Sequence, residues 1–211
     1  MKVLLVNGGP HKEGCTFTAL SEVAKTLTEE GIENEIFWIG NKPIAGCIAC
    51  KMCAKMGECV FKDVVSEFVE KAKEVDGFVF GSPVHYAGAT GAMTSFMDRV
   101  FYSASQTGKS DRFLLKPAAS VISARRAGTT ATFDQMNKYF GITQMPIISS
   151  RYWNMVHGQT PEEVKRDEEG MQIMRTLGRN MAYYLKCIQV GKEKGISVPK
   201  QEKVTFTNFI K

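Results

Sequence analysis

Four cysteines stand close together in the sequence, and their spacing could do chemistry. Two residues separate Cys47 from Cys50 and Cys50 from Cys53, and five separate Cys53 from Cys59. Four thiolates within thirteen residues can surround one compact group, and they suit a [4Fe–4S] cluster. Paired ligands with a long span between them, the usual zinc arrangement, are absent here. Free redox-active thiols and another metal are the alternatives.

A glycine-rich loop near the N-terminus is the second candidate. Residues 7–16 read Asn-Gly-Gly-Pro-His-Lys-Glu-Gly-Cys-Thr, after an apolar run at 2–6 and before a helical pattern. Such a strand–loop–helix junction brings backbone N–H groups and the positive end of a helix dipole together, which suits a phosphate group. Neither the Walker loop nor the dinucleotide fingerprint is present. We therefore expect a mononucleotide phosphate here, the alternative being that the glycines only make a tight turn.

Two more loops follow apolar strands further along the chain. Residues 82–88, Ser-Pro-Val-His-Tyr-Ala-Gly, come after the continuous apolar run at 77–81. Residues 124–129, Ala-Arg-Arg-Ala-Gly-Thr, come after the run at 117–123. Ligands of parallel α/β sheets bind at the carboxyl ends of strands. We expect the three loops to converge on one ligand.

The elements that must position these loops alternate along the chain. Strands are predicted at 2–6, 35–39, 77–81, 117–123 and 145–149, and helices at 17–27, 63–75, 90–102, 129–140 and 161–187. This alternation predicts an α/β fold, a doubly wound parallel sheet with helices on both faces. Residues 1–190 would form one domain with a cysteine-rich insert at 46–60, and residues 191–211 a tail. Residues 103–115 are expected to be polar and exposed, and residues 204–210 have strand character and could dock on this or a neighbouring subunit.

Composition narrows the classes of function. The 211 residues are 44% hydrophobic and 23% charged, enough for one sizeable core. The net charge of +5 is scattered, which does not favour a nucleic-acid partner. No apolar run approaches the roughly 20 residues of a membrane span. Crowded cysteines are typical of a reducing compartment, so a cytoplasmic protein is expected.

Residues 7–16 resemble the phosphate loop of the flavodoxin-like NAD(P)H-dependent FMN reductases, which usually read Gly-Ser-Pro-Arg-Lys-x-x-Asn-Thr. Residues 81–88 with Met97-Asp-Arg99 are similar to that family's isoalloxazine loop and helix, and residues 123–128 stand at its third flavin loop. The chain departs from the family pattern at Gly9, His11 and Cys15, where Ser, Arg and Asn are usual, and at His85, where Tyr is common.

The resemblance implies a five-stranded sheet in the order 2-1-3-4-5 and an FMN molecule lying across the three loops. The implied phosphate-loop residues are Gly9, His11, Lys12, Cys15, Thr16 and Phe17. The isoalloxazine loop would contribute Pro83, Val84, His85, Tyr86, Ala87 and Gly88, and the third loop Ala124, Arg125, Arg126 and Gly128. Either arginine would stabilise the anionic reduced flavin. No side-chain acid or base is required for hydride transfer.

The cysteine spacing closely resembles that of the iron–sulfur flavoproteins, a branch of the same family. The resemblance implies that Cys47, Cys50, Cys53 and Cys59 hold a cluster that relays electrons to or from the flavin. Family members assemble as dimers or higher, so a homodimer or homotetramer is expected. Tyr152 and Trp153, after the predicted fifth strand, could wall the flavin pocket or serve as core or subunit-contact aromatics.

Three hypotheses for function follow. The first is an iron–sulfur flavoprotein that receives electrons from a ferredoxin-like donor. The second is an NAD(P)H-dependent enzyme, without a cluster, that passes hydride from FMN to a small quinone, nitro, azo or enone compound. The third, from another class, is a flavodoxin-like binding module without catalysis. An FMN-dependent oxidoreductase is common to the first two.

Overall fold

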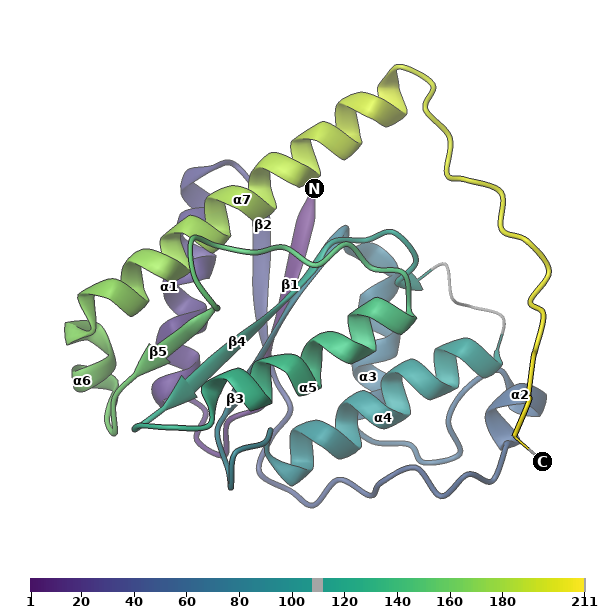
Figure 1. The fold of residues 1–211 in the computed structure, drawn as a ribbon, viewed down its shortest axis with the longest axis horizontal. Coiled ribbons are helices and arrows are strands. Elements are labelled where there is room, and N and C mark those ends of the chain that lie inside the picture. The colour runs from purple at the N-terminus through teal and green to yellow at the C-terminus, as the bar shows by residue number, and fades with distance from the viewer. Residues whose placement is uncertain (108–111, 211) are drawn as a thin grey trace.

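The apolar runs pair as one parallel sheet in the computed structural model, which describes residues 1–107 and 112–210 (Figure 1). The strand order is β2-β1-β3-β4-β5, and every pair is parallel. The strands are β1 (Lys2–Asn7), β2 (Glu33–Trp38), β3 (Gly77–Pro83), β4 (Ala118–Ala124) and β5 (Met155–His157). The predicted flavodoxin-like fold class is therefore confirmed.

Helices cover both faces of the sheet. The α-helices are α1 (Cys15–Glu29), α2 (Met52–Met56), α3 (Val64–Lys71), α4 (Gly91–Gln106), α5 (Thr129–Ile142), α6 (Pro161–Arg166) and α7 (Glu168–Glu193), and a 3₁₀ turn, η1 (Ala72–Glu74), follows α3. One core cluster joins α1, α6 and α7 to the sheet, and the other joins α3, α4 and α5 to it. No described helix is both long and apolar enough to cross a membrane.

The three central strands are buried on both faces. In β3 and β4 nearly every residue is buried, as the continuous apolar run at 77–81 and the largely apolar run at 117–123 predict. Gly81 in β3 allows α1 to approach closely, because a Cβ there would lie 2.8 Å from side-chain atoms of both Thr16 and Leu20. Because Gly81 has no side chain, α1 and the loop before it lie close to the end of β3.

The prediction of a fifth strand at residues 145–149 is wrong. Ile147 makes only an isolated bridge to Ala118 at the start of β4, and β5 is formed instead by Met155–His157 beside the end of β4. Residues 145–149 and β5 both lie beside β4, and residues 145–149 are the more apolar of the two. A prediction based on apolar sequence therefore chooses the wrong segment. Tyr152 and Trp153 consequently precede β5, and both are exposed.

Three other boundaries differ from prediction. The closing helix expected at 161–187 is divided at Asp167, whose carboxylate caps α7 by accepting from the Gly170 amide at 3.0 Å. Residues 103–115 are not uniformly exposed, because α4 continues to Gln106 and Phe113 is fully buried; residues 108–111 lie outside the described part. The tail begins after α7, at residue 194 rather than 191.

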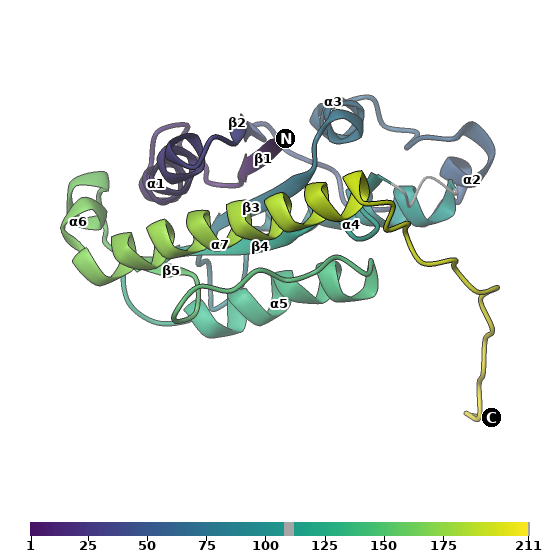
Figure 2. The same ribbon diagram turned by 90° about the horizontal axis from the view of Figure 1, so that it is seen from above.

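The tail runs from the end of α7 along the outside of the molecule (Figures 1 and 2). Within residues 194–210 no strand is formed, and Phe206, Phe209 and Ile210 are almost fully exposed. Earlier tail residues border two clefts, one beside the end of α7 and one lined by α4 and α5.

Candidate functional site

The loop between β1 and α1 is held in shape by the side chain of Asn7, at the end of β1. Its Oδ1 accepts from the Gly9 amide at 3.0 Å, and its Nδ2 donates to the Lys12 carbonyl at 3.0 Å. Trp38 Nε1, from the end of β2, donates to the Gly9 carbonyl at 2.9 Å. Because its interior is braced, the loop presents its remaining amides in a fixed arrangement.

The three predicted loops meet at the carboxyl edge of the sheet. The Gly8 amide donates to the Gly81 carbonyl at 2.8 Å, which joins the first loop to β3. The hydroxyls of Thr16 and Ser123 share a buried hydrogen bond of 2.8 Å, which joins α1 to β4. The Val84 amide donates to the Ser123 carbonyl at 2.9 Å, which joins the second loop to the end of β4, directly before the third loop. Thr16 therefore has its hydroxyl engaged within the protein.

Two helices begin at this edge without a side-chain cap. Asp63, Thr90 and Asp167 accept backbone N–H groups at the starts of α3, α4 and α7, whereas α1 and α5 begin at Gly14 and Gly128 with no capping side chain. The amides of Cys15, Thr16 and Phe17 accordingly have no acceptor among the described residues. Uncapped helix N-termini attract an anion, and a ligand phosphate can take the place of the missing cap.

The second loop leaves two backbone donors free. His85 and Gly88 pair their backbones, with N···O distances of 2.8 and 3.1 Å, and Pro83 has no N–H. Between them Tyr86 and Ala87 adopt left-handed conformations, with φ of 51° and 60°. Their amides have no acceptor in the described residues, so they are the donors that residues 83–88 can offer to a flat heteroaromatic edge.

Gly128 lets the third loop approach the second. Its φ is +95°, and a Cβ there would lie 2.8 Å from both Ala87 Cα and Val84 Cγ1. The start of α5 thus lies directly against the turn at Tyr86 and Ala87. Gln135 of α5 strengthens the contact, because its Oε1 accepts from the Ala89 amide at 2.9 Å.

Cationic side chains stand on the same loops. Lys12 on the first loop and Arg125 and Arg126 on the third are exposed, as is His11 beside Lys12. Neither arginine has an ion pair or a side-chain hydrogen bond with a described residue. Two uncapped helix starts and free cations together fit a phosphate monoester, and the two free amides of the second loop fit a heteroaromatic ring. The donor set therefore fits FMN.

Cys15 occupies the first position of α1, where the FMN reductase pattern has Asn. Its side chain is half-buried, and burial raises the pKa of its thiol. The residue's own backbone N–H opposes this rise, and the nearby carboxylates of Glu163 and Glu162, at the start of α6, add to it. A thiol held neutral at this position can donate a weak hydrogen bond and adds no negative charge beside the phosphate loop.

The cysteine loop lies at the far end of α4 from the flavin loops. Cys53 is in α2, which packs against α4, and Cys47, Cys50 and Cys59 lie in the segments around it. All four cysteines line one small cavity of about 20 Å³, walled by Arg99 and Tyr102 of α4. Within the described residues no three Cys, His, Asp or Glu side chains are spaced to hold one metal ion.

The thiols are therefore gathered as the cluster prediction requires, but they do not stand at ligand distances. The cavity has room for about one water molecule. Metal binding commonly organises its own ligands, because the binding free energy also orders the loop that carries them. The donor set fits a [4Fe–4S] cluster in chemistry, and the loop would have to open to admit one.

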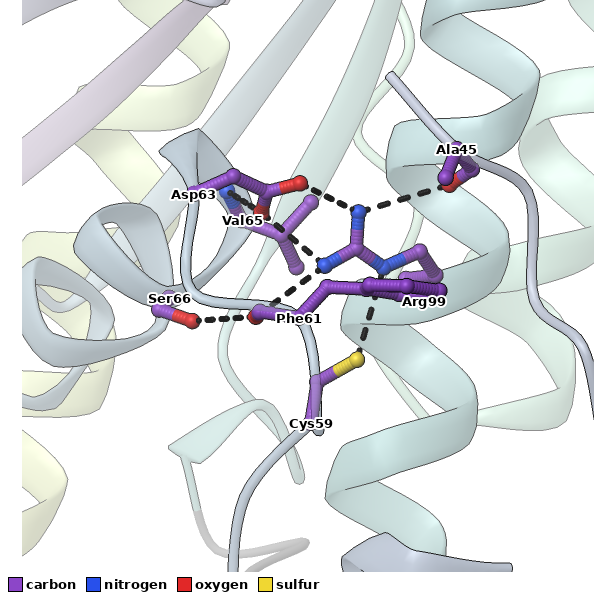
Figure 3. Close-up of polar contacts among 7 residues, drawn as sticks. All are labelled: Ala45, Cys59, Phe61, Asp63, Val65, Ser66 and Arg99. Carbon is purple, nitrogen blue, oxygen red and sulfur yellow. Dashed lines mark hydrogen bonds and ion pairs between the residues drawn. The ribbon is translucent and has the colours of Figure 1, made fainter. Parts of the chain in front are cut away.

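A buried arginine holds the ends of this loop (Figure 3). Arg99 of α4 is 1% exposed and makes a two-fold contact with Asp63, at 2.6 Å from Nη1 to Oδ2 and 2.9 Å from Nη2 to Oδ1. It also donates to the carbonyls of Ala45 and Phe61, each at 3.3 Å, and its Nε lies 3.4 Å from Cys59 Sγ. One side chain thus contacts residues on both sides of the cysteine segment.

Sequence reasoning missed several residues that shape the site. Asn7 and Ser123 are buried polar residues at strand ends, and polarity in an apolar strand is the signal that could have pointed to them. Arg99 belongs to the Met-Asp-Arg motif, yet its contacts are with residues 36 to 54 positions away and no local pattern encodes them. Trp38 carries no signal beyond its place at the end of a strand.

The fold and the site together define a flavodoxin-like protein with a site for a flavin mononucleotide. The sequence profile of the NADPH-dependent FMN reductase family matches residues 1–160. An iron–sulfur flavoprotein of Methanocaldococcus jannaschii is 32% identical over 194 residues, 90% of this chain and all of that protein. The chain therefore belongs to the NADPH-dependent FMN reductase family, alongside relatives named iron–sulfur flavoproteins, and is an FMN-dependent oxidoreductase.

Solved structures agree on the fold. RosB, solved with bound 8-demethyl-8-formylriboflavin-5'-phosphate, superimposes with a TM-score of 0.66 at 14% identity, covering 100% of this chain and 94% of that one. A flavodoxin from the domain Archaea gives a TM-score of 0.59 at 14% identity, covering 88% of this chain and 99% of that one. At these identities the likeness concerns the fold.

Proposed function

We propose that this protein passes electrons between FMN on the three loops and a [4Fe–4S] cluster held by Cys47, Cys50, Cys53 and Cys59, exchanging them with a small-molecule or ferredoxin-like partner. The observation that carries the proposal is that the four cysteines, spread over thirteen residues, line one cavity against α4. The names of the relatives support it.

When bound, FMN exchanges one or two electrons and an iron–sulfur cluster exchanges one, so the pair can connect hydride donors with single-electron carriers. The chain's part is to bind and orient. The amides of Cys15, Thr16 and Phe17 would hold the phosphate, and those of Tyr86 and Ala87 the ring edge. Arg125 and Arg126 would balance negative charge on the reduced ring.

One helix connects the two proposed sites. Thr90 caps α4 beside the first loop, where its hydroxyl donates to the Gly8 carbonyl at 3.2 Å. Arg99, nine residues later on the same helix, holds the cysteine loop. At 1.5 Å per residue, Thr90 and Arg99 are about 14 Å apart along the helix axis. A rigid helix of this length keeps the spacing of the two sites constant.

Spectra of anaerobically purified protein, with iron and sulfide analysis, test the proposal. A flavin spectrum with broad cluster absorption, and about four irons and four sulfides per chain, is expected. Cys50→Ser should lose iron and sulfide because Cys50 is a proposed ligand. Cys187→Ser, at an exposed cysteine of α7 outside the loop, should keep them.

A second candidate is a cluster-free NAD(P)H-dependent reductase of quinone, nitro, azo or enone compounds. The family match favours it. Flavin without iron in anaerobic protein, together with fast bleaching of the flavin by NAD(P)H, would replace the first proposal with this one.

A further inference from the structure

Arg99 is fully buried, yet its functional groups all face the cysteine loop (Figure 3). Its guanidinium is fixed by the carboxylate of Asp63, and the Phe61 ring lies 4.9 Å from its central carbon. Asp63 is itself fixed, because its Oδ1 also accepts the Val65 amide at 3.1 Å as the cap of α3. The guanidinium therefore has little freedom to turn.

The fixed orientation directs Nε at one cysteine. The Nε–Sγ distance to Cys59 is 3.4 Å, and no other cysteine of the loop has a side-chain hydrogen-bond donor among the described residues. The two remaining nitrogens hold the Ala45 carbonyl before Cys47 and the Phe61 carbonyl after Cys59. Arg99 thus fixes the two ends of the loop and contacts its last sulfur.

We propose that Arg99 is the positioning residue of the cysteine loop: it fixes Cys59 and, when a cluster is bound, raises the reduction potential of that cluster. The second part rests on the proposed function. An electron added to a cluster increases the negative charge on its sulfurs, so a cationic N–H donor stabilises the reduced form more than the oxidised form. Hydrogen bonds to cluster sulfurs are among the determinants of such potentials.

Two variants separate this role from simple packing. Arg99→Lys keeps the charge, but one ammonium group cannot reach both Asp63 oxygens and Cys59 at once. The double variant Asp63→Asn with Arg99→Gln removes both charges, so no unpaired buried charge remains. Arg175→Lys is the matched control, because Arg175 pairs with Glu22 at 2.6 Å between α7 and α1, away from the loop.

The first readout is the midpoint potential of the anaerobic, cluster-loaded protein, measured by redox titration with electron paramagnetic resonance. Both variants are expected to have a more negative potential than the wild type, and Arg175→Lys the wild-type potential. Cluster retention with an unchanged potential in both variants would overturn the proposal, because a residue that only packs would leave the potential where it was.

The second readout uses cluster-free protein. It tests the positioning role of Arg99 even if the variants lose iron. Trypsin cleavage after Lys51 and Lys55 is expected to be at least about fivefold faster in both variants, because the loop opens locally. Unchanged cleavage would refute the positioning role. If the wild type takes up no iron, the proposed function fails by that result, and the cleavage rates alone decide the role of Arg99.

Discussion

Arg125 and Arg126 are exposed cations directly after β4, and no described residue pairs with either side chain. Exposed arginines contribute little to the free energy of unfolding. Replacing them should therefore affect ligand binding more than stability. They stand in the loop that leads to the uncapped start of α5, where an anionic ligand is favoured. We therefore expect them to contribute to FMN binding.

Replacing both arginines with alanine should weaken FMN binding at least about tenfold, since a lost charge-assisted hydrogen bond costs about 1.5–3 kcal/mol. The dissociation constant can be measured by titrating FMN and following the quenching of its fluorescence. Arg179→Ala, at an exposed arginine of α7, is the matched control and should bind FMN as the wild type does. Equal affinities in all three proteins would remove both arginines from the site.

At the scale of elements, the start of α5 and the loop after β3 depend on one glycine. Gly128→Ala places a Cβ 2.8 Å from Ala87 Cα at a φ of +95°. We expect a loss of about 1–3 kcal/mol in the free energy of unfolding and weaker FMN binding, because the turn at Tyr86 and Ala87 must shift.

Gly31→Ala is the control that separates backbone strain at a positive φ from displacement of a neighbouring loop. Gly31 also has a positive φ, +75°, but a Cβ there would have no atom within 4 Å. It should cost stability without changing FMN affinity. Urea unfolding and FMN titration of both variants provide the comparison, and an equal loss of FMN affinity in the two would show that the Gly128 contact does not shape the site.

A hydrogen bond joins the middle of α4 to the last turn of α5. The Tyr139 hydroxyl donates to Asp98 Oδ1. Burial, followed by this hydrogen bond and then by the Asp98 charge, raises the pKa of the phenol above its usual value. The folded state thus favours the protonated phenol. Its stabilising contribution is complete below the unfolded pKa of about 10 and is lost as the pH rises above that value.

Tyr139→Phe should therefore lower the free energy of unfolding by about 1–2 kcal/mol at pH 7. The difference from the wild type should shrink at pH 10.5, where the unfolded wild-type phenol ionises. Urea unfolding at the two pH values measures both quantities. Tyr184→Phe, at a half-exposed tyrosine of α7, should change neither. A constant difference at both pH values would contradict the assignment.

The elements differ in how well the sequence encodes them. β3 and β4 were predictable because a strand buried on both faces is apolar along most of its length. β5 was not, because its three residues pair at the sheet edge while the more apolar segment at 145–149 only touches the start of β4. The division between α6 and α7 depends on Asp167, whose carboxylate also accepts the His157 amide from β5.

The same holds for the site. The glycine loop and the cysteine spacing are local patterns, so their positions could be read from the sequence. The contacts that shape them join residues far apart in the chain: Thr16 to Ser123, and Arg99 to Cys59. Such pairings follow from the sheet order and from helix packing, which no single stretch of sequence specifies.

At the scale of the whole molecule, the three candidate flavin loops lie at the carboxyl edge of the sheet. The strand order β2-β1-β3-β4-β5 switches sides between β1 and β3, and ligands of parallel α/β sheets bind at such a switch point. The described loops are joined to one another by only a few backbone and hydroxyl contacts, so a ligand lying across them would add connections between α1, β3 and α5.

FMN should therefore stabilise the whole fold and not only the loops. At a free concentration of 100 times its dissociation constant, a ligand of the folded state adds about 2.7 kcal/mol. For a chain of this size that corresponds to a rise of about 5–10 °C in the melting temperature. Riboflavin lacks the phosphate that the uncapped starts of α1 and α5 would hold, so at the same concentration it should raise the melting temperature far less. Thermal unfolding of flavin-free protein at increasing concentrations of each compound measures the difference, and equal shifts would show that the glycine loop does not hold the phosphate.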